Sequence, residues 1–182
     1  MSGAQGSARS KIDAPTPPSW AGSLIKPGDI LLSYFPYDEA PDDPGPKYHP
    51  VLVLAANRRV NPWQLFVAYG TSSDLQLKFA WQFIIPPLGD QSSAKRANRT
   101  RPTKFDLKRT VLLNYNEAWF ARPSNMIYPR MGELDQAGKA VFEQARTAYE
   151  VHVGTSLIPG KPALITPTTD PDEPAAAGAE PA

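Results

Sequence analysis

The chain contains no cysteine among its 182 residues. A disulfide framework, a thiolate metal site and redox sensing through cysteine are therefore excluded. The chain also lacks any run close to the roughly 18 apolar residues that a membrane-spanning helix needs. Its first residues, Met-Ser-Gly-Ala-Gln-Gly-Ser, have no apolar core for a secretory signal. These absences predict a cytoplasmic protein.

Neither sign of charge is in excess. The chain has 19 Lys and Arg against 18 Asp and Glu, which leaves a formal net charge of +1. This balance excludes a uniformly basic nucleic-acid binder, so any such role must depend on a local patch. The length favours one domain with its own core over two domains.

Proline is abundant, with 21 residues, and much of it lies towards the two ends. Residues 1–21 are rich in Ser, Gly, Ala and Pro, and residues 158–182 are rich in Pro and Ala and acidic. Such segments bury too little apolar surface to offset the entropy lost on ordering. We therefore predict two disordered tails around a single domain that spans residues 22–157.

Apolar runs of strand length, separated by turn-forming residues, fill most of this domain. They predict a mostly β domain of the α+β class, built as a small barrel or a strongly curled sheet. The last two runs form either two short strands or one bent strand. The predicted strands span residues 30–35, 50–55, 63–69, 79–85, 103–107 and 110–113.

One helix is predicted near the end of the domain. Asp135 is the predicted N-cap, and apolar residues recur at helical spacing from Leu134 to Tyr149. We expect this helix to pack on the sheet with Phe142 and Tyr149 directed inward.

Several short segments occur along the chain in an order that can be compared with known families. They are a Pro-Gly-Asp-Ile start, a Pro-Val-Leu-Val-Leu strand, a strand ending in Thr-Ser-Ser, a Lys-Phe-Asp-Leu-Lys-Arg-Thr-Val segment, and Met-Gly-Glu-Leu before the helix. This ordered set resembles the MazF/PemK (Kid) toxins over residues 27–149, with a longer insertion between Asp74 and Arg101. The resemblance implies an SH3-like barrel with a C-terminal helix, usually a homodimer. It also implies metal-independent cleavage of single-stranded RNA, neutralised by a cognate antitoxin protein that fills the RNA groove.

Cleavage of RNA without a metal needs a base for the 2′-hydroxyl, an acid for the leaving oxygen, and positive donors for the phosphorane. His49 can titrate near neutral pH, and it occupies a position where the family has Arg. Thr71 offers a hydroxyl at a strand end. Lys104, at a second family Arg position, and Asp106 are two residues apart on a strand and project to the same face. We predict these side chains as catalytic and expect no metal or cofactor.

Each of these residues also has a structural interpretation. Thr71 can cap a turn through its hydroxyl, and His49 can cap a strand. Lys104 and Asp106 can form an ordinary exposed ion pair, which adds little stability.

Positive side chains in a basic segment and in a loop before the second strand predict binding to the RNA phosphates, which weakens as salt is added. Tyr48 is the one aromatic residue that we expect to stack on a base. Phe79, Trp81 and Tyr69 lie in or beside strands, where aromatic residues belong more often to the core. The predicted RNA-binding residues are Lys47, Tyr48, Ser72, Arg96, Arg99, Arg101 and Arg109.

Two functions stay open at this point. The first is an endoribonuclease toxin, and the second is a catalytically inactive SH3-like barrel that binds nucleic acid or a protein partner. Small barrels host many unrelated functions, so the predicted fold does not decide between them. A DNA-binding regulator has less support, because no two closely spaced helices suited to a major groove are predicted.

Overall fold

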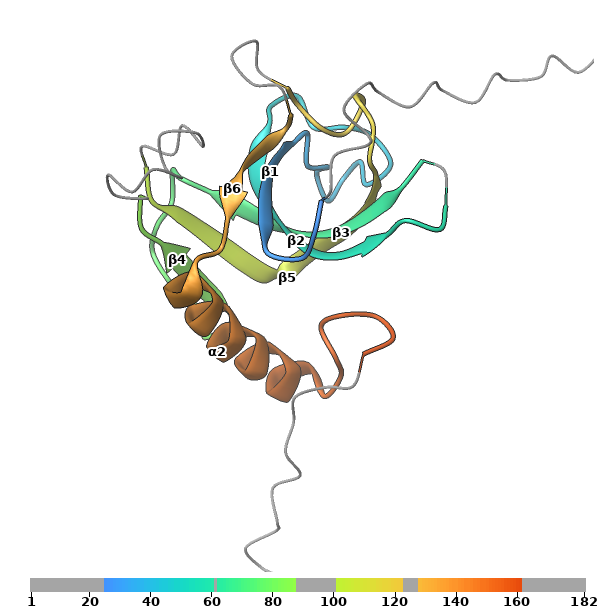
Figure 1. Ribbon diagram of the computed structural model, residues 1–182. Coiled ribbons are helices and arrows are strands. Elements are labelled where there is room, and N and C mark those ends of the chain that lie inside the picture. The colour runs from blue at the N-terminus through green and yellow to red at the C-terminus, as the bar shows by residue number, and fades with distance from the viewer. Residues whose placement is uncertain (1–24, 61, 88–100, 123–127, 162–182) are drawn as a thin grey trace, which may run out of the picture.

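The computed structural model describes residues 25–60, 62–87, 101–122 and 128–161 (Figure 1). Six strands form one antiparallel sheet in the order β4-β5-β3-β2-β1-β6, and one long helix follows them. This confirms a sheet of antiparallel strands with a helix near the C-terminus. Residues 1–21 and 162–182 of the predicted tails lie outside the described residues. The elements are β1 (Asp29–Ser33), β2 (His49–Asn57), β3 (Gln64–Thr71), β4 (Gln82–Ile85), β5 (Thr103–Asn114), β6 (Arg130–Glu133) and α2 (Gln136–Val153).

The sheet is strongly curled, and the segment after β5 returns to β1 (Figure 1). The N–H of Tyr34 donates to the carbonyl of Trp119 at 2.9 Å, and the N–H of Ala121 donates to that of Leu32 at 3.0 Å. Strands β4 and β6 are the two edges, and across the described ranges no ladder joins them. The observed architecture is therefore a curled sheet in which the segment that follows β5 is hydrogen-bonded to the end of β1.

The alternation of side chains along the strands separates two apolar cores, one on each face of the sheet. We call the face inside the curl the inner face and the face towards α2 the outer face. The inner core includes Phe35, Val51, Val53, Leu65, Val67, Tyr115 and Phe120. The outer core includes Leu52, Leu54, Phe83, Phe105, Leu107 and Leu134.

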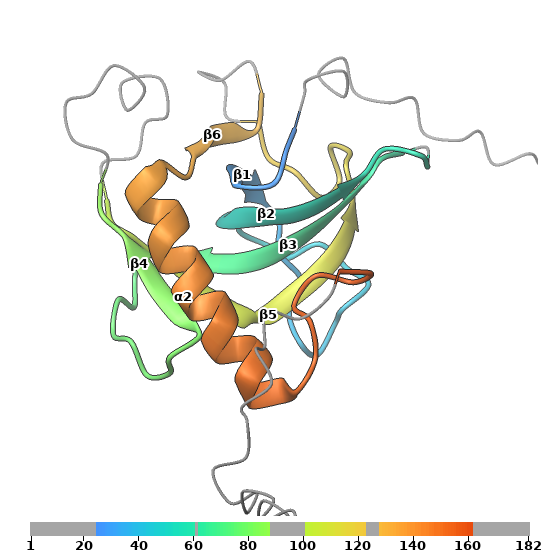
Figure 2. The ribbon, with the colours of Figure 1, turned by 60° about the horizontal axis from the view of Figure 1, so that its bottom comes forward.

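Helix α2 covers the outer face (Figure 2). Asp135 caps its N-terminus as predicted, because the carboxylate accepts from the N–H of Gly138 at 2.7 Å. Phe142 and Tyr149 pack against the outer core, which confirms the predicted inward face. Beyond the helix, Leu157 and Ile158 are buried in the same core, so the packed part of the chain extends one residue past the expected boundary.

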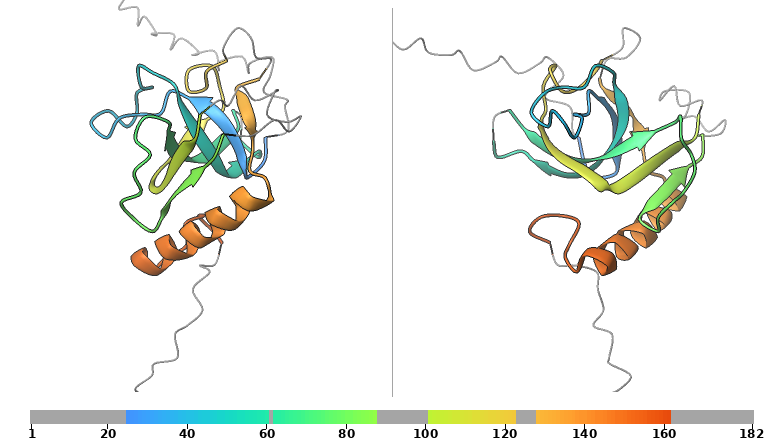
Figure 3. Two further views of the ribbon diagram at one scale, coloured as in Figure 1. Left: turned by 90° about the vertical axis from the view of Figure 1, so that its left-hand side faces the viewer. Right: turned by 180° about the vertical axis from the view of Figure 1, so that it is seen from behind.

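Strand β5 is one bent strand, and a bulge causes the bend (Figure 3, right). Ala68 pairs with Thr110 whereas its neighbour Tyr69 pairs with Asp106, so residues 107–109 bulge out of the β3–β5 ladder. Bulges bend a strand and change the direction of its side chains. Here the bulge carries Lys108 and Arg109.

The strand predicted at 79–85 begins only at Gln82, because residues 79–81 form a turn before it. Among the described residues, no helix is both long and apolar enough to cross a membrane.

Candidate active site

Strand register places the predicted catalytic side chains on the inner face. Thr71 pairs with Lys104 and Tyr69 with Asp106, and residues paired across a ladder share a face. His49 lies two residues before Val51, which itself pairs with Tyr69, so His49 has the same orientation. Tyr69 packs against the inner core, which identifies that face. Residues from three strands thus meet at one end of the curled sheet.

His49 at the start of β2 is half-buried and contacts Tyr69. Its Nδ1 atom lies 3.3 Å from the Tyr69 hydroxyl, and the two ring centroids are 5.1 Å apart. Burial lowers the pKa of His49 below its ordinary value of 6.5, and the positive charges of Arg109 and Lys47 lower it further. The imidazole is therefore neutral at neutral pH and able to accept a proton.

Arg109 supplies a positive charge beside this pair. Its Cζ atom lies 4.3 Å from the ring centroid of Tyr69 and 5.8 Å from that of Phe35. Arg109 also forms a long ion pair of 3.8 Å with the exposed Asp38, and its side chain stays 38% exposed. A guanidinium held over aromatic rings with an open side is well placed to meet an anion. We call His49, Tyr69 and Arg109 the imidazole cluster.

The Asp106 carboxylate is fixed by hydrogen bonds to both of its oxygens. Oδ2 accepts from the Gln82 side-chain amide at 2.7 Å, and Oδ1 accepts from the N–H of Lys108 at 3.0 Å. The second bond belongs to the bulge, so Asp106 and Arg109 are positioned by the same distortion of β5.

Lys104 has a different partner from the one expected. Its ammonium donates to Asp74 at 2.9 Å and to the carbonyl of Gln76 at 3.0 Å, and the side chain is 7% exposed. The same hydrogen bond holds the pKa of Asp74 below its ordinary value. The predicted couple of Lys104 with Asp106 is thus replaced by two separate sets of contacts. Lys104 ties the loop after β3 to the sheet.

The hydroxyl of Thr71 makes a local turn contact, since it accepts from the N–H of Ser73 at 3.2 Å. Ser72 beside it is exposed. Lys47 and Tyr48 are exposed in the loop before β2, and the Tyr48 ring lies edge-on to Tyr34 at 6.3 Å.

Besides Lys47, two of the predicted basic residues are in reach of solvent, namely Arg109 in the imidazole cluster and the exposed Arg101 just before β5. Arg96 and Arg99 lie outside the described residues.

The sequence assigned Tyr69 and Phe79 to the core. Tyr69 does pack against the inner core, and it also has a second role at the site, whereas Phe79 lies at the surface. Tyr69 links His49 to Arg109 through its hydroxyl and its ring. Phe79 is 51% exposed. The sequence feature that could have predicted this role of Tyr69 is its position next to Gly70 and Thr71 at a strand end, where polar groups meet solvent.

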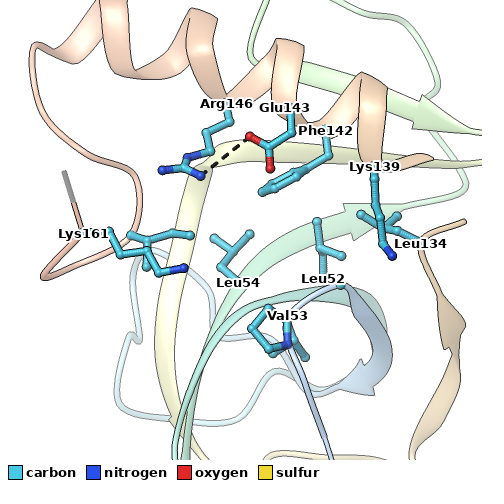
Figure 4. Close-up of a pocket in the computed structure, with 12 residues that line it drawn as sticks. Leu52, Val53, Leu54, Leu134, Lys139, Phe142, Glu143, Arg146 and Lys161 are labelled. Carbon is cyan, nitrogen blue, oxygen red and sulfur yellow. Dashed lines mark ion pairs between the residues drawn. The ribbon is translucent and has the colours of Figure 1, made fainter. Parts of the chain in front are cut away.

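Two of the cavities in the described part of the chain lie beside the sheet. The first, of about 330 Å³, adjoins the imidazole cluster and lies between the loop after β1 and the loop before β4, which project from the same side of the sheet (Figure 3, left). The second, of about 200 Å³, lies between α2 and β2 (Figure 4). Leu52, Leu54 and Phe142 line it, and the Glu143–Arg146 ion pair of 3.6 Å lies at its upper side. Of these two, the first cavity shares Arg109 with the imidazole cluster.

Comparison with known proteins gives a structural likeness. No family model matches the chain, and no curated protein matches its sequence. The chain is similar in structure to an endoribonuclease in complex with its cognate antitoxin from a mycobacterial species, with a TM-score of 0.43 and 12% sequence identity. The likeness covers 72% of this chain and 96% of that chain. Residue roles therefore have to come from the geometry of this chain itself.

Within the described ranges, no three His, Asp or Glu side chains are grouped so that they could hold a metal ion.

Proposed function

We propose that this protein is an endoribonuclease that cleaves single-stranded RNA by metal-independent acid/base chemistry. The observation that carries the proposal is the imidazole cluster, in which a neutral histidine and an arginine contact the same tyrosine. The ordered segments that resemble the MazF/PemK toxins support the same function. The curled sheet, with its 119–121 segment returned to β1, is compatible with the SH3-like barrel of that family.

The proposed reaction begins when neutral His49 takes the proton of a ribose 2′-hydroxyl. The 2′-oxygen attacks the adjacent phosphorus, and the bond from phosphorus to the 5′-oxygen breaks. Arg109 stabilises the negative charge that develops on the phosphorane. The proton then passes to the 5′-oxygen, which leaves a 2′,3′-cyclic phosphate and a 5′-hydroxyl as the products.

The other predicted residues have supporting roles in this proposal. Asp106 accepts hydrogen bonds from the Gln82 side chain and from the N–H of Lys108. It thereby fixes the bulge of β5 that carries Arg109. Thr71 and Ser72 lie at the end of β3, where backbone N–H groups and hydroxyls can hold a phosphate. Lys104 keeps the neighbouring loop in place through Asp74 and does not take part in proton transfer.

The proposed partners are single-stranded RNA, a cognate antitoxin and a second copy of this chain. A neutralising antitoxin would have to cover the half-exposed Arg109, and acidic side chains would match it. Such a protein would block the RNA site by occupying it.

The test is incubation of the purified protein with single-stranded RNA in the presence of EDTA. We expect cleavage, with cyclic phosphate ends, and a loss of about 10²–10⁴-fold in rate for His49→Ala. The matched control is Lys139→Ala, since Lys139 is an exposed residue of α2 that lines the other cavity, away from the imidazole cluster. Equal rates for the two variants would overturn the role of His49.

A catalytically inactive RNA-binding protein is the second candidate. It is favoured by the engagement of Lys104 with Asp74, which removes one predicted participant from the chemistry. RNA that stays intact in EDTA but forms a complex that weakens steeply with salt would establish this candidate instead.

A further inference from the structure

We propose that the cavity beside Arg109 is a subsite for one unpaired RNA base, with Phe79 as its stacking platform. We call it the base subsite, and this inference rests on the proposed function. The cavity has a volume of about 330 Å³. Its lining residues are Phe35, Asp38, Phe79, Trp81, Asp106, Lys108, Arg109 and Thr110.

The first observation is a stack of rings that is buried at one end and open at the other. The rings of Phe79 and Trp81 are almost parallel, with 5° between their planes and 4.7 Å between centroids. Trp81 is 8% exposed and also stacks on His152 of α2 at 4.5 Å. Phe79, by contrast, is 51% exposed. A rigid, supported ring with an open side is what a base needs in order to stack.

The second observation concerns hydrogen bonding. Trp81 Nε1 is buried, and no described residue accepts its hydrogen bond. A buried donor without a partner is uncommon, because it loses its hydration without compensation. Trp81 is among the residues that line the base subsite. Because Nε1 itself is enclosed, it gives a base no contact in this arrangement, and the base subsite rests on the ring stack and on the charges around it.

The charges of the base subsite decide which part of a nucleotide it takes. Asp38 and Asp106 would repel a phosphate, but their carboxylates can accept from the amino group of a base. Lys108, whose Nζ atom lies 5.7 Å from the Trp81 ring centroid, and Arg109 provide positive charge for the adjoining phosphate. Adenine, cytosine and guanine carry an exocyclic amino group, whereas uracil does not. The base subsite therefore favours these three bases over uracil.

The base subsite is continuous with the imidazole cluster. Arg109 and Phe35 line the cavity, and both also contact Tyr69, the partner of His49. A base stacked on Phe79 would thus belong to a nucleotide near the scissile phosphate. The turn at 79–81 and β4 lie in the insertion between Asp74 and Arg101, so the preference would be specific to this chain.

The test measures binding of short RNA with methylated 2′-oxygens, which cannot be cleaved, by fluorescence anisotropy with the full chain. We expect Phe79→Ala to weaken binding of an adenine oligomer about tenfold, the size expected for loss of one stacked base. Phe79→Tyr should bind like the original protein. Leu77→Ala is the matched control, since Leu77 lies in the same loop, is also 51% exposed and does not line the cavity. A uracil oligomer should bind more weakly than the adenine oligomer and respond less to Phe79→Ala.

Equal binding by Phe79→Ala and Leu77→Ala would overturn the base subsite, and so would equal affinity for adenine and uracil oligomers. Failure of the proposed function gives a different result. If RNA stays intact in EDTA while Phe79→Ala still weakens binding, the base subsite is supported and the nuclease activity is rejected. If RNA is cleaved and Phe79→Ala changes neither binding nor the positions of the cuts, the nuclease activity is supported and the base subsite is rejected.

Discussion

The outer face of the curled sheet and the open end of its inner face differ in chemistry, although each face has an apolar core. On the outer face, α2 covers a continuous apolar core, and the buried Arg146 and Glu150 of the helix are paired at 2.9 Å. At the open end of the inner face, His49, Arg109 and Asp106 remain partly accessible. Burial on one side supplies the stability that lets the other side keep titratable groups near solvent.

The two cavities show the same contrast. The cavity under α2 lies between leucine side chains of β2 and Phe142 of α2, and its charged lining residues come from α2 and from Lys161 (Figure 4). The cavity beside the imidazole cluster has two carboxylates, two cations and an exposed ring. The polar cavity is therefore the one at which the proposed RNA site lies.

The largest effect on stability is expected at the covered face. Phe105→Ala removes a fully buried ring of the outer core and should lower the free energy of unfolding by about 3–5 kcal/mol. Urea denaturation measures this loss. Tyr69→Phe at the open end deletes only a hydroxyl contact with His49, and should cost about 1 kcal/mol or less. If the two variants lost similar amounts of unfolding free energy, the contrast between the outer face and the open end of the inner face would be contradicted.

A second effect should appear in the pH dependence of RNA cleavage. The rate requires neutral His49, so it should fall about tenfold per pH unit once the pH drops below the pKa of this residue. Because that pKa is lowered, the fall should begin at a pH below 6.5. Lys47→Ala should move it upward towards 6.5, since Lys47 is one of the charges that lower the pKa. If the cleavage rate began to fall at pH 6.5 or above, and Lys47→Ala did not shift this fall, the lowered pKa of His49 would be contradicted.

The smallest effect is expected at the loop that Lys104 holds. Asp74→Asn should lower the thermal midpoint slightly at neutral pH, because the ion pair with Lys104 is lost. The pKa of Asp74 is depressed, so its contribution is present above its ordinary value of 3.8 and is lost as the pH falls through the folded-state pKa. The two proteins should therefore converge in acid. Midpoints that differ equally at all pH values would indicate another cause.

Part of the site was accessible from the sequence. The hydroxyl of Thr71 at a strand end and the imidazole of His49 before a strand follow from local patterns, and register then places both on one face. Asp74 as the partner of Lys104, and Tyr69 as the link from His49 to Arg109, did not follow. Both depend on contacts between segments far apart in the chain, where several carboxylates or rings are equally available.

The sequence by itself determined the elements: the alternating apolar runs of the strands, the Asp135 cap and the inward face of α2. These features depend on neighbours within a few residues, so the local pattern contains the information. Only the tertiary structure decided how the strands align and where β5 bulges. That bulge sets the direction of Arg109 and the fixed position of Asp106, because a shift in register between two strands changes which side chains meet.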